Sequence, residues 1–462
     1  MDRLRRLFSR GGKSPSRDGQ AYEPLPDDGE GSAPFLRRDT DDEHDGHDIP
    51  FSWVEYSIFT MLGVAMLWAW NMFLAAAPYF ATRFRGDAWL AANFQSAVLS
   101  ASTVTNLGAM LLLANVQSSA SYPFRITTAL VMNVGFFSLL TASTTTLTAW
   151  ATGLMQNGAF AFAAGFGRPE YMQAIMTGQA VAGVLPSVAQ MVSYLAFSGD
   201  NNTAGGHDDE QSKQQQLSQE SAGAAAFYYF LTAVVVSSAA LAAFLPLIRR
   251  HNRIVEGRMS DRMAASHASV EEAERAARRV VGPVELFRKL HFYASAVFLC
   301  FTITMFFPVF TSKIVSVRSS STEGEPLPPL FQPGAFIPLA FFFWNLGDLA
   351  GRVSSTHPFF AALRRRPSVL FGLTAARVCF LPLYMLCNVG GRGAVVHSDL
   401  FYLLLVQLPF GLTNGWLGSS AMMAASDWVE EPEREAAGAF MALCLVAGLA
   451  AGSVLSFTVS GI

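Results

Sequence analysis

Long apolar blocks, each about as long as a membrane is thick, recur along the whole chain. A transmembrane helix needs about 20 mostly apolar residues, and we find eleven stretches that meet this requirement. They lie at 54–79, 95–117, 123–148, 151–167, 171–197, 223–247, 290–316, 332–353, 368–389, 399–424 and 436–460. The sequence therefore predicts an all-α, polytopic membrane protein with eleven transmembrane helices.

The composition favours the same class. Of the 462 residues, 51% are hydrophobic and 15% are charged, whereas soluble proteins average about 25% charged residues. The net charge is −3, and the sequence has no stripe of basic residues of the kind that binds nucleic acid. We therefore expect the chain to interact with the lipid bilayer and not with nucleic acid. The four cysteines all lie inside apolar blocks and are expected to be free thiols.

Polar segments divide the chain. Residues 1–50 are charged and rich in Pro and Gly, which predicts a disordered cytosolic tail. A polar linker at 248–289 separates a six-helix bundle at 51–247 from a five-helix bundle at 290–462. Inside the first bundle, Gly165-Phe-Gly-Arg-Pro169 separates the fourth and fifth segments, because Gly and Pro together end a helix.

The distribution of arginine predicts the orientation. Arginines gather in the N-terminal tail, in the linker and at 364–366, and with eleven spans these regions share one side, which should be cytosolic. The opposite side receives 198–222, where Asn201-Asn202-Thr203 is a glycosylation sequon. Asn201 is therefore a candidate glycosylation site on the lumenal side.

Three polar residues fall within the eighth apolar segment. Asn345, Asp348 and Arg352 are spaced so that they share one helix face. Ionisable side chains in a membrane span are costly and often functional. A carboxylate, a guanidinium and an amide on one stripe can hydrogen-bond a polyol. The alternative is an Asp–Arg pair that only neutralises itself, and we favour the functional interpretation by about two to one.

Other polar groups in the apolar segments are less specific. Trp70 and Asn71 together could stack on a base and bond its edge, or could simply pack between helices. Arg377 and the Thr413-Asn414-Gly415-Trp416 run could line a cavity or bridge helices. The sequence has no HExxH motif and no Cys/His cluster, so we expect no catalytic residues, no metal site and no cofactor.

Several motifs in a fixed order resemble those of the equilibrative nucleoside transporter family, most closely its fungal vacuolar members. They are Met61-Leu-Gly63, Trp70-Asn71, Gly178-Gln179, Phe301-Thr-Ile-Thr-Met305 with Pro308, Asp348-x-x-Gly351-Arg352, Ala376-Arg377, Leu386-Cys-Asn388, Asn414-Gly415 and Glu435-Ala-Ala-Gly438-Ala-Phe-Met441. The resemblance runs from the first apolar segment to the C-terminus. It implies a major-facilitator-like fold of six helices against five, with the substrate held between the halves.

The resemblance also implies a set of substrate-binding residues. Trp70, Gly153 and Asn157 match positions near the nucleobase, although many members have Gln where this chain has Asn157. Asp348 and Arg352 match a pair associated with the ribose, and Asn345 lies on the same helix face. The remaining expected cavity residues are Leu74, Leu107 and Phe341.

These observations predict facilitative, alternating-access transport of nucleosides, with nucleobases as a further substrate class. An organic-cation transporter of the same fold and a membrane-embedded enzyme are the alternatives. In the tail, Tyr22-Glu-Pro-Leu25 is typical of a signal read by sorting adaptors. We therefore expect a vacuolar or lysosomal membrane, with the plasma membrane as the alternative.

Overall fold

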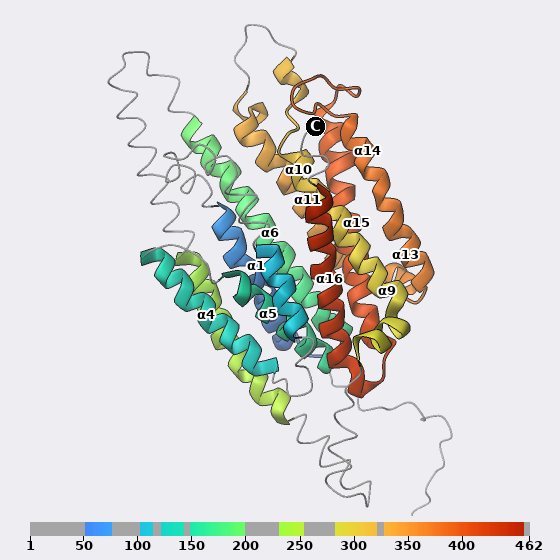
Figure 1. Cartoon of the computed structure of the whole chain (residues 1–462). Coiled ribbons are helices and arrows are strands. Elements are labelled where there is room, and N and C mark those ends of the chain that lie inside the picture. Colours follow the sequence, from blue (N-terminus) through green and yellow to red (C-terminus); the bar gives the residue numbers. More distant parts are fainter. Residues whose placement is uncertain are drawn as a thin grey trace, which may run out of the picture. The chain divides into compact units, whose positions relative to one another are not determined.

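Helices make up the part of the chain that the computed structural model describes (Figure 1). The described residues are 51–75, 102–113, 122–142, 148–198, 231–253, 282–320 and 328–456. They all belong to one unit, Ile49–Ile462, whereas the other unit, Met1–Asp48, lies outside the described residues. Within these ranges, β-structure is limited to a bridge between Ile314 and Val389.

Each predicted segment contains helical residues. Before the linker the helices are α1 (Trp53–Ala75), Ser102–Leu113, α4 (Tyr122–Ala142), α5 (Thr148–Gly165), α6 (Pro169–Ser198) and Leu231–Arg253. After it come α9 (Pro283–Thr304), α10 (Phe306–Thr311), α11 (Pro333–Ser354), α12 (Pro358–Arg364), α13 (Pro367–Ala376), α14 (Phe380–Met385), α15 (Leu408–Asp427) and α16 (Arg434–Ser456). Short 3-10 turns are η2 (Val317–Ser320), η3 (Pro329–Phe331), η4 (Arg377–Cys379) and η6 (Glu431–Glu433), and η5 (Phe401–Gln407) is a π-helix.

The all-helical prediction is confirmed for the described residues. Six helices there are long and apolar enough to cross a membrane. The count of eleven spans and the division into six and five remain predictions.

Prolines mark where several helices begin. In the described ranges α6, α9, α11, α12 and α13 all start with proline, whose missing N–H costs nothing in the first turn of a helix. The seventh predicted helix therefore starts at Pro283, inside the expected linker, and not near residue 290. The predicted turn between α5 and α6 is confirmed, and Gly167 adopts the left-handed backbone conformation there, with φ of 68°.

Prolines also explain three irregular turns inside the predicted segments. The α-helical pattern is interrupted at Met305 in the seventh segment and at η4 in the ninth, and the tenth includes the π-helix η5. A proline removes the hydrogen bond to the carbonyl four residues earlier and clashes with it. Pro308, Pro382 and Pro409 stand shortly after these three places. The helices Pro283–Thr311 and Pro367–Met385 nevertheless continue through the first two, as the predicted segments require.

Inside α6 the same defect is repaired by a neighbouring helix. Pro186 lies within α6 and leaves the carbonyl of Ala182 without its helical donor. Asn71 of α1 donates its Nδ2 to this oxygen at 2.7 Å. Such replacement donors let helices in a membrane contain proline. The amide of Asn71 is thus engaged in helix packing, which favours the packing interpretation of this residue.

We expect Asn71→Leu to destabilise the protein by about 1–3 kcal/mol, because the carbonyl of Ala182 would be buried without a donor. In a Pro186→Ala background the new backbone N–H can bond this carbonyl, so the same replacement should cost much less. Thermal unfolding of the four proteins in detergent measures both effects. An equal loss in both backgrounds would contradict this role of Asn71.

Helix α6 holds a central place in the packing. It lies against α1 on one side and against α11 on another (Figure 1), and α11 in turn packs along α15. Gly351 of α11 and Gly415 of α15 let these two backbones meet. A methyl group on Gly415 would overlap the carbonyl oxygen of Asp348, and one on Gly351 would overlap that of Leu412. Small residues at helix contacts are typical of membrane proteins.

Candidate functional site

Asp348 and Arg352 form an ion pair on α11. Their spacing places them one turn apart on the same face, and Arg352 Nε donates to Asp348 Oδ2 at 2.8 Å. Their exposed fractions are 3% and 5%, so both charges are shielded from solvent. An isolated charge in such surroundings is very costly, and pairing offsets part of this cost.

Helix α6 supplies the other partners of Arg352. Arg352 Nη1 donates to the carbonyl oxygen of Met176 at 2.6 Å and lies 3.3 Å from Gln179 Oε1. In the opposite direction, Gln173 Nε2 donates to the carbonyl oxygens of Arg352 and Val353 at 2.9 and 3.0 Å. Because α6 precedes the predicted linker and α11 follows it, these bonds join the two predicted halves.

The sequence interpretation assigned no role to Gln173 or Gln179. Both are amide side chains within an apolar segment, and both are at least 96% buried, with exposed fractions of 3% and 4%. A buried amide in a membrane span needs a partner. That requirement is the signal by which the sequence could have pointed to these two residues.

The third residue of the polar stripe also faces α6. Asn345 Nδ2 donates to Ser187 Oγ at 3.2 Å and to the carbonyl oxygen of Phe341 at 2.9 Å. The ring of Phe341 packs edge-on against Phe307, with centroids 5.0 Å apart. In this conformation α6 therefore covers the stripe that we expected to line a cavity.

The second oxygen of Asp348 is held by α15. Asn414 Nδ2 donates to Asp348 Oδ1 at 2.7 Å, and Asn414 is 2% exposed. The amide oxygen of Asn414 accepts from Thr304 Oγ1 of α9 at 2.6 Å. The Thr413–Trp416 run thus contains a direct partner of the ion pair, which spacing along one helix did not reveal.

Asn157 is bonded within the predicted N-terminal half. Arg125 of α4 donates its Nη1 to Asn157 Oδ1 at 2.5 Å, and both residues are buried. Arg125 is a cation in an apolar segment, a signal that the sequence interpretation left unused. The side-chain oxygen of Asn157 is thus already engaged in this conformation, in the amide that we expected to contact the base.

The other predicted residues are placed less fully. Leu107 is half-buried in the helix Ser102–Leu113 and packs against the apolar core. Trp70 and Leu74 lie in α1 and Gly153 lies in α5, but their surroundings fall outside the described part. The predicted sorting residues Tyr22 and Leu25 and the sequon residue Asn201 also lie outside the described residues.

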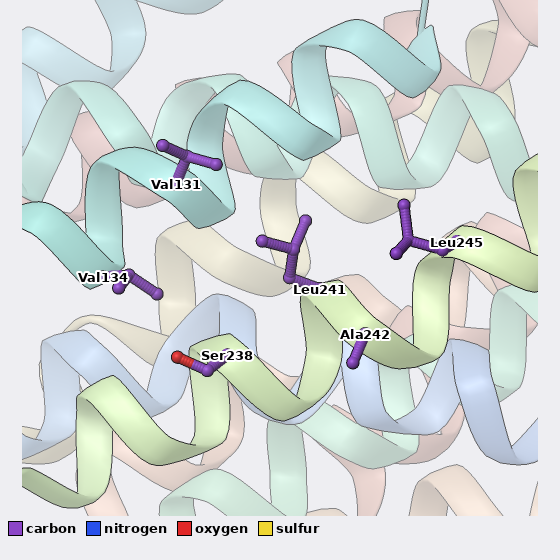
Figure 2. Close-up of a pocket in the computed structure, with 6 residues that line it drawn as sticks. All are labelled: Val131, Val134, Ser238, Leu241, Ala242 and Leu245. Atoms are coloured by element: carbon purple, nitrogen blue, oxygen red, sulfur yellow. The ribbon is translucent and has the colours of Figure 1, made fainter.

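A groove between α4 and the helix Leu231–Arg253 has a different character (Figure 2). Its volume is about 280 Å³, and it is lined by Val131, Val134, Ser238, Leu241, Ala242 and Leu245. The hydroxyl of Ser238 is the one polar side-chain group among these residues. A polar solute needs several convergent polar partners, so the groove is not the candidate site.

The chemistry of the site on α11 suits a neutral polyol. An ionised carboxylate accepts hydrogen bonds from hydroxyl groups, and a guanidinium donates from a fixed planar fork. Together they present both senses of hydrogen bond at little net charge. The amides of Gln179, Asn345 and Asn414 add further donors and acceptors around the pair.

Comparisons with known proteins agree with this description. The model of the nucleoside transporter family matches residues 141–460, which is more than half of the chain. Nucleoside transporter FUN26 of Saccharomyces cerevisiae is 30% identical over 459 residues, covering 87% of this chain and 83% of the yeast protein. Equilibrative nucleoside transporter 3 of Rattus norvegicus is 27% identical over 436 residues, covering 86% of this chain and 87% of the rat protein.

Solved structures were compared as well. A crystal structure of FucP, a major facilitator superfamily transporter in the outward conformation, aligns with a TM-score of 0.49 at 14% identity. The alignment covers 88% of this chain and 96% of that chain.

Proposed function

Because the chain belongs to the nucleoside transporter family, we propose that it carries nucleosides across a membrane by facilitated, alternating-access transport. It is a multi-pass membrane transporter and not an enzyme. The proposed substrate is a small molecule with a ribose, and nucleobases form a second class to be tested.

The observation that carries this proposal is the buried Asp348–Arg352 pair where α6 meets α11. In the proposed site the carboxylate accepts from the ribose hydroxyls and the guanidinium donates to the sugar oxygens. Charged groups within membrane spans commonly mark substrate pathways. The pair also lies where α6, from one predicted half, meets α11, from the other.

The bonds across that boundary suggest how access alternates. Arg352 holds α6 through the carbonyl oxygen of Met176, and Gln173 holds the end of α11. A nucleoside can reach Asp348 only when such bonds open. We propose that the sugar replaces the bonds from Arg352 to α6 as the halves rock around the site.

Uptake of radiolabelled uridine and adenosine into proteoliposomes tests the proposed function. We expect saturable uptake that stops at equal concentrations inside and outside and that excess unlabelled nucleoside inhibits. Repeating the assay with a pH gradient shows whether protons are coupled. Protein-free liposomes give the background. Uptake of an organic cation without uptake of either nucleoside would contradict the proposal and support the alternative transporter.

We further propose that the protein resides in a vacuolar or lysosome-like membrane, addressed by Tyr22 and Leu25 in the N-terminal tail. Tyr22→Ala should move a fluorescently tagged protein to the plasma membrane, because adaptors would no longer read the motif. Phe35→Ala, an aromatic change elsewhere in the same tail, is the matched control and should not move it. Vacuolar location of the Tyr22 variant would remove the motif from this account.

A further inference from the structure

A second arginine lies buried beside the candidate site. Arg377 of η4 is 1% exposed, and its Nη1 donates to the carbonyl oxygen of Cys300 at 2.8 Å. Its Nη2 lies 3.4 Å from Thr304 Oγ1. Among the described residues, no carboxylate lies within salt-bridge distance of this guanidinium. Its positive charge therefore acts through neutral neighbours.

Thr304 and, beyond it, Asn414 connect Arg377 to Asp348. Thr304 Oγ1 lies 2.6 Å from Asn414 Oδ1, and Asn414 Nδ2 lies 2.7 Å from Asp348 Oδ1. Thr304 and Asn414 are 8% and 2% exposed. The result is a buried chain of hydrogen bonds from one guanidinium to the carboxylate, with Arg352 at the other end.

The direction of this chain follows from its members. An ionised Asp348 can only accept, so Asn414 turns its Nδ2 toward it and its Oδ1 away. That Oδ1 then needs a donor. The hydroxyl of Thr304 lies 2.6 Å from it and 2.7 Å from the carbonyl oxygen of Cys300, which already accepts from Arg377, so the single hydroxyl proton of Thr304 goes to Oδ1. The thiol of Cys300, 3.4 Å from the same oxygen, is a weaker second donor. Thr304 thereby selects the amide orientation in which Asn414 holds Asp348.

The bond from Asn414 to Asp348 Oδ1 matters because Asp348 could otherwise pair with Arg352 through both of its oxygens. Carboxylates and guanidinium groups readily form bidentate pairs. If Asn414 released Oδ1, both oxygens could turn to Arg352, and fewer acceptors would remain for a substrate. The present arrangement gives one oxygen to Arg352 and fixes the other on α15.

We propose that Thr304 and Asn414 are positioning residues for the ribose-binding carboxylate, and that they couple Asp348 to the buried charge of Arg377. The inference rests on the proposed function, since it gives Thr304 and Asn414 the role of orienting the Asp348 carboxylate, which recognises the sugar. Neither residue needs to touch the nucleoside. Their effect is on how well Asp348 distinguishes a ribose from a sugar that lacks its hydroxyls.

The test compares isosteric variants at one position. Thr304→Val keeps the shape and removes the hydroxyl, whereas Thr304→Ser keeps the hydroxyl. Binding of uridine and of 2′,3′-dideoxyuridine is measured on the purified full chain. Loss of a hydrogen bond in this charged network should weaken uridine binding by Thr304→Val about tenfold. Binding of the dideoxy analogue should change little, and Thr304→Ser should behave like the wild type.

Thr302 offers a matched control on the same helix. It is also buried, with 7% exposed, and its hydroxyl donates to the carbonyl oxygen of Phe298 at 2.8 Å and lies 3.1 Å from that of Gly448. These contacts lead to α16 and not to Asp348. Thr302→Val should therefore leave the preference for uridine over its dideoxy analogue unchanged.

Several results would overturn the inference. One is wild-type uridine binding by Thr304→Val, and another is an equal loss for uridine and the dideoxy analogue. If Thr304→Val does not fold, Asn414→Ala breaks the same chain from the other side and must show the same selective loss. Failure of the wild type to bind either nucleoside would instead reject the proposed function.

Discussion

Replacing Asp348 by asparagine and Arg352 by glutamine in one protein should weaken uridine binding about ten- to hundredfold while the protein still folds. Each charge-assisted hydrogen bond is worth roughly 1.5–3 kcal/mol, which corresponds to that range of affinity. The double variant removes both charges, keeps the shape of residue 348 and leaves a shorter polar side chain at position 352. It therefore separates recognition of the sugar from structural support.

Single variants would not separate these roles. Removing one member of a buried pair leaves the other charge without its partner and costs roughly 3–5 kcal/mol. The surrounding bonds favour folding of the double variant. Asn414 can still donate to an amide oxygen at position 348. The amide of glutamine at position 352 ends where Arg352 Nε lies, so it can bond the amide nitrogen that asparagine brings to position 348.

Uracil is the matched ligand for this experiment, because it carries the base without the ribose. Its binding should change little in the double variant if Asp348 and Arg352 hold the sugar. Equal weakening for uridine and uracil would argue against a ribose role. Near-normal uridine transport would show that the pair only neutralises itself.

The sequence was sufficient for features that depend on neighbours along one helix. The contact between Asp348 and Arg352 follows from their spacing on one turn. The turn before Pro169 follows from local Gly and Pro chemistry. The irregular turns near Pro308, Pro382 and Pro409 also have a local cause. Proline alone does not predict such a turn, however, because Pro186 and Pro338 lie inside α6 and α11.

Partners on other helices could not be predicted in the same way. Nothing in the spacing of α11 indicates that Arg352 bonds the backbone of α6, or that Asn414 bonds Asp348 from α15. Such contacts depend on how the helices pack in three dimensions. Amide and cationic side chains in apolar segments do, however, predict that hydrogen-bonding partners exist on other helices. Gln179 and Arg125 are examples.

Alanine at Gly415 should destabilise the protein by about 1–3 kcal/mol or more and should abolish transport. The added methyl group would overlap the carbonyl oxygen of Asp348, and a backbone atom of a packed helix cannot move aside as the end of a flexible side chain can. Forcing an extra carbon into such a contact has costs of this size. Relief requires α11 and α15 to separate.

Gly372 provides the control, because it also lies in a helix, α13, but a methyl group there would meet nothing within 4 Å. Alanine is favoured over glycine inside helices by about 1 kcal/mol. Gly372→Ala should therefore be as stable as the wild type or slightly more stable. Thermal unfolding in detergent and uridine uptake are measured for both variants.

The outcome also bears on how the site is built. Asp348 contributes its side chain to the ion pair and its backbone to the contact with Gly415, so separating α11 from α15 would move the carboxylate away from Asn414. We therefore expect Gly415→Ala to lose transport even in the fraction of protein that remains folded. If that folded fraction transports uridine normally, then the close approach of α11 and α15 does not set the position of Asp348.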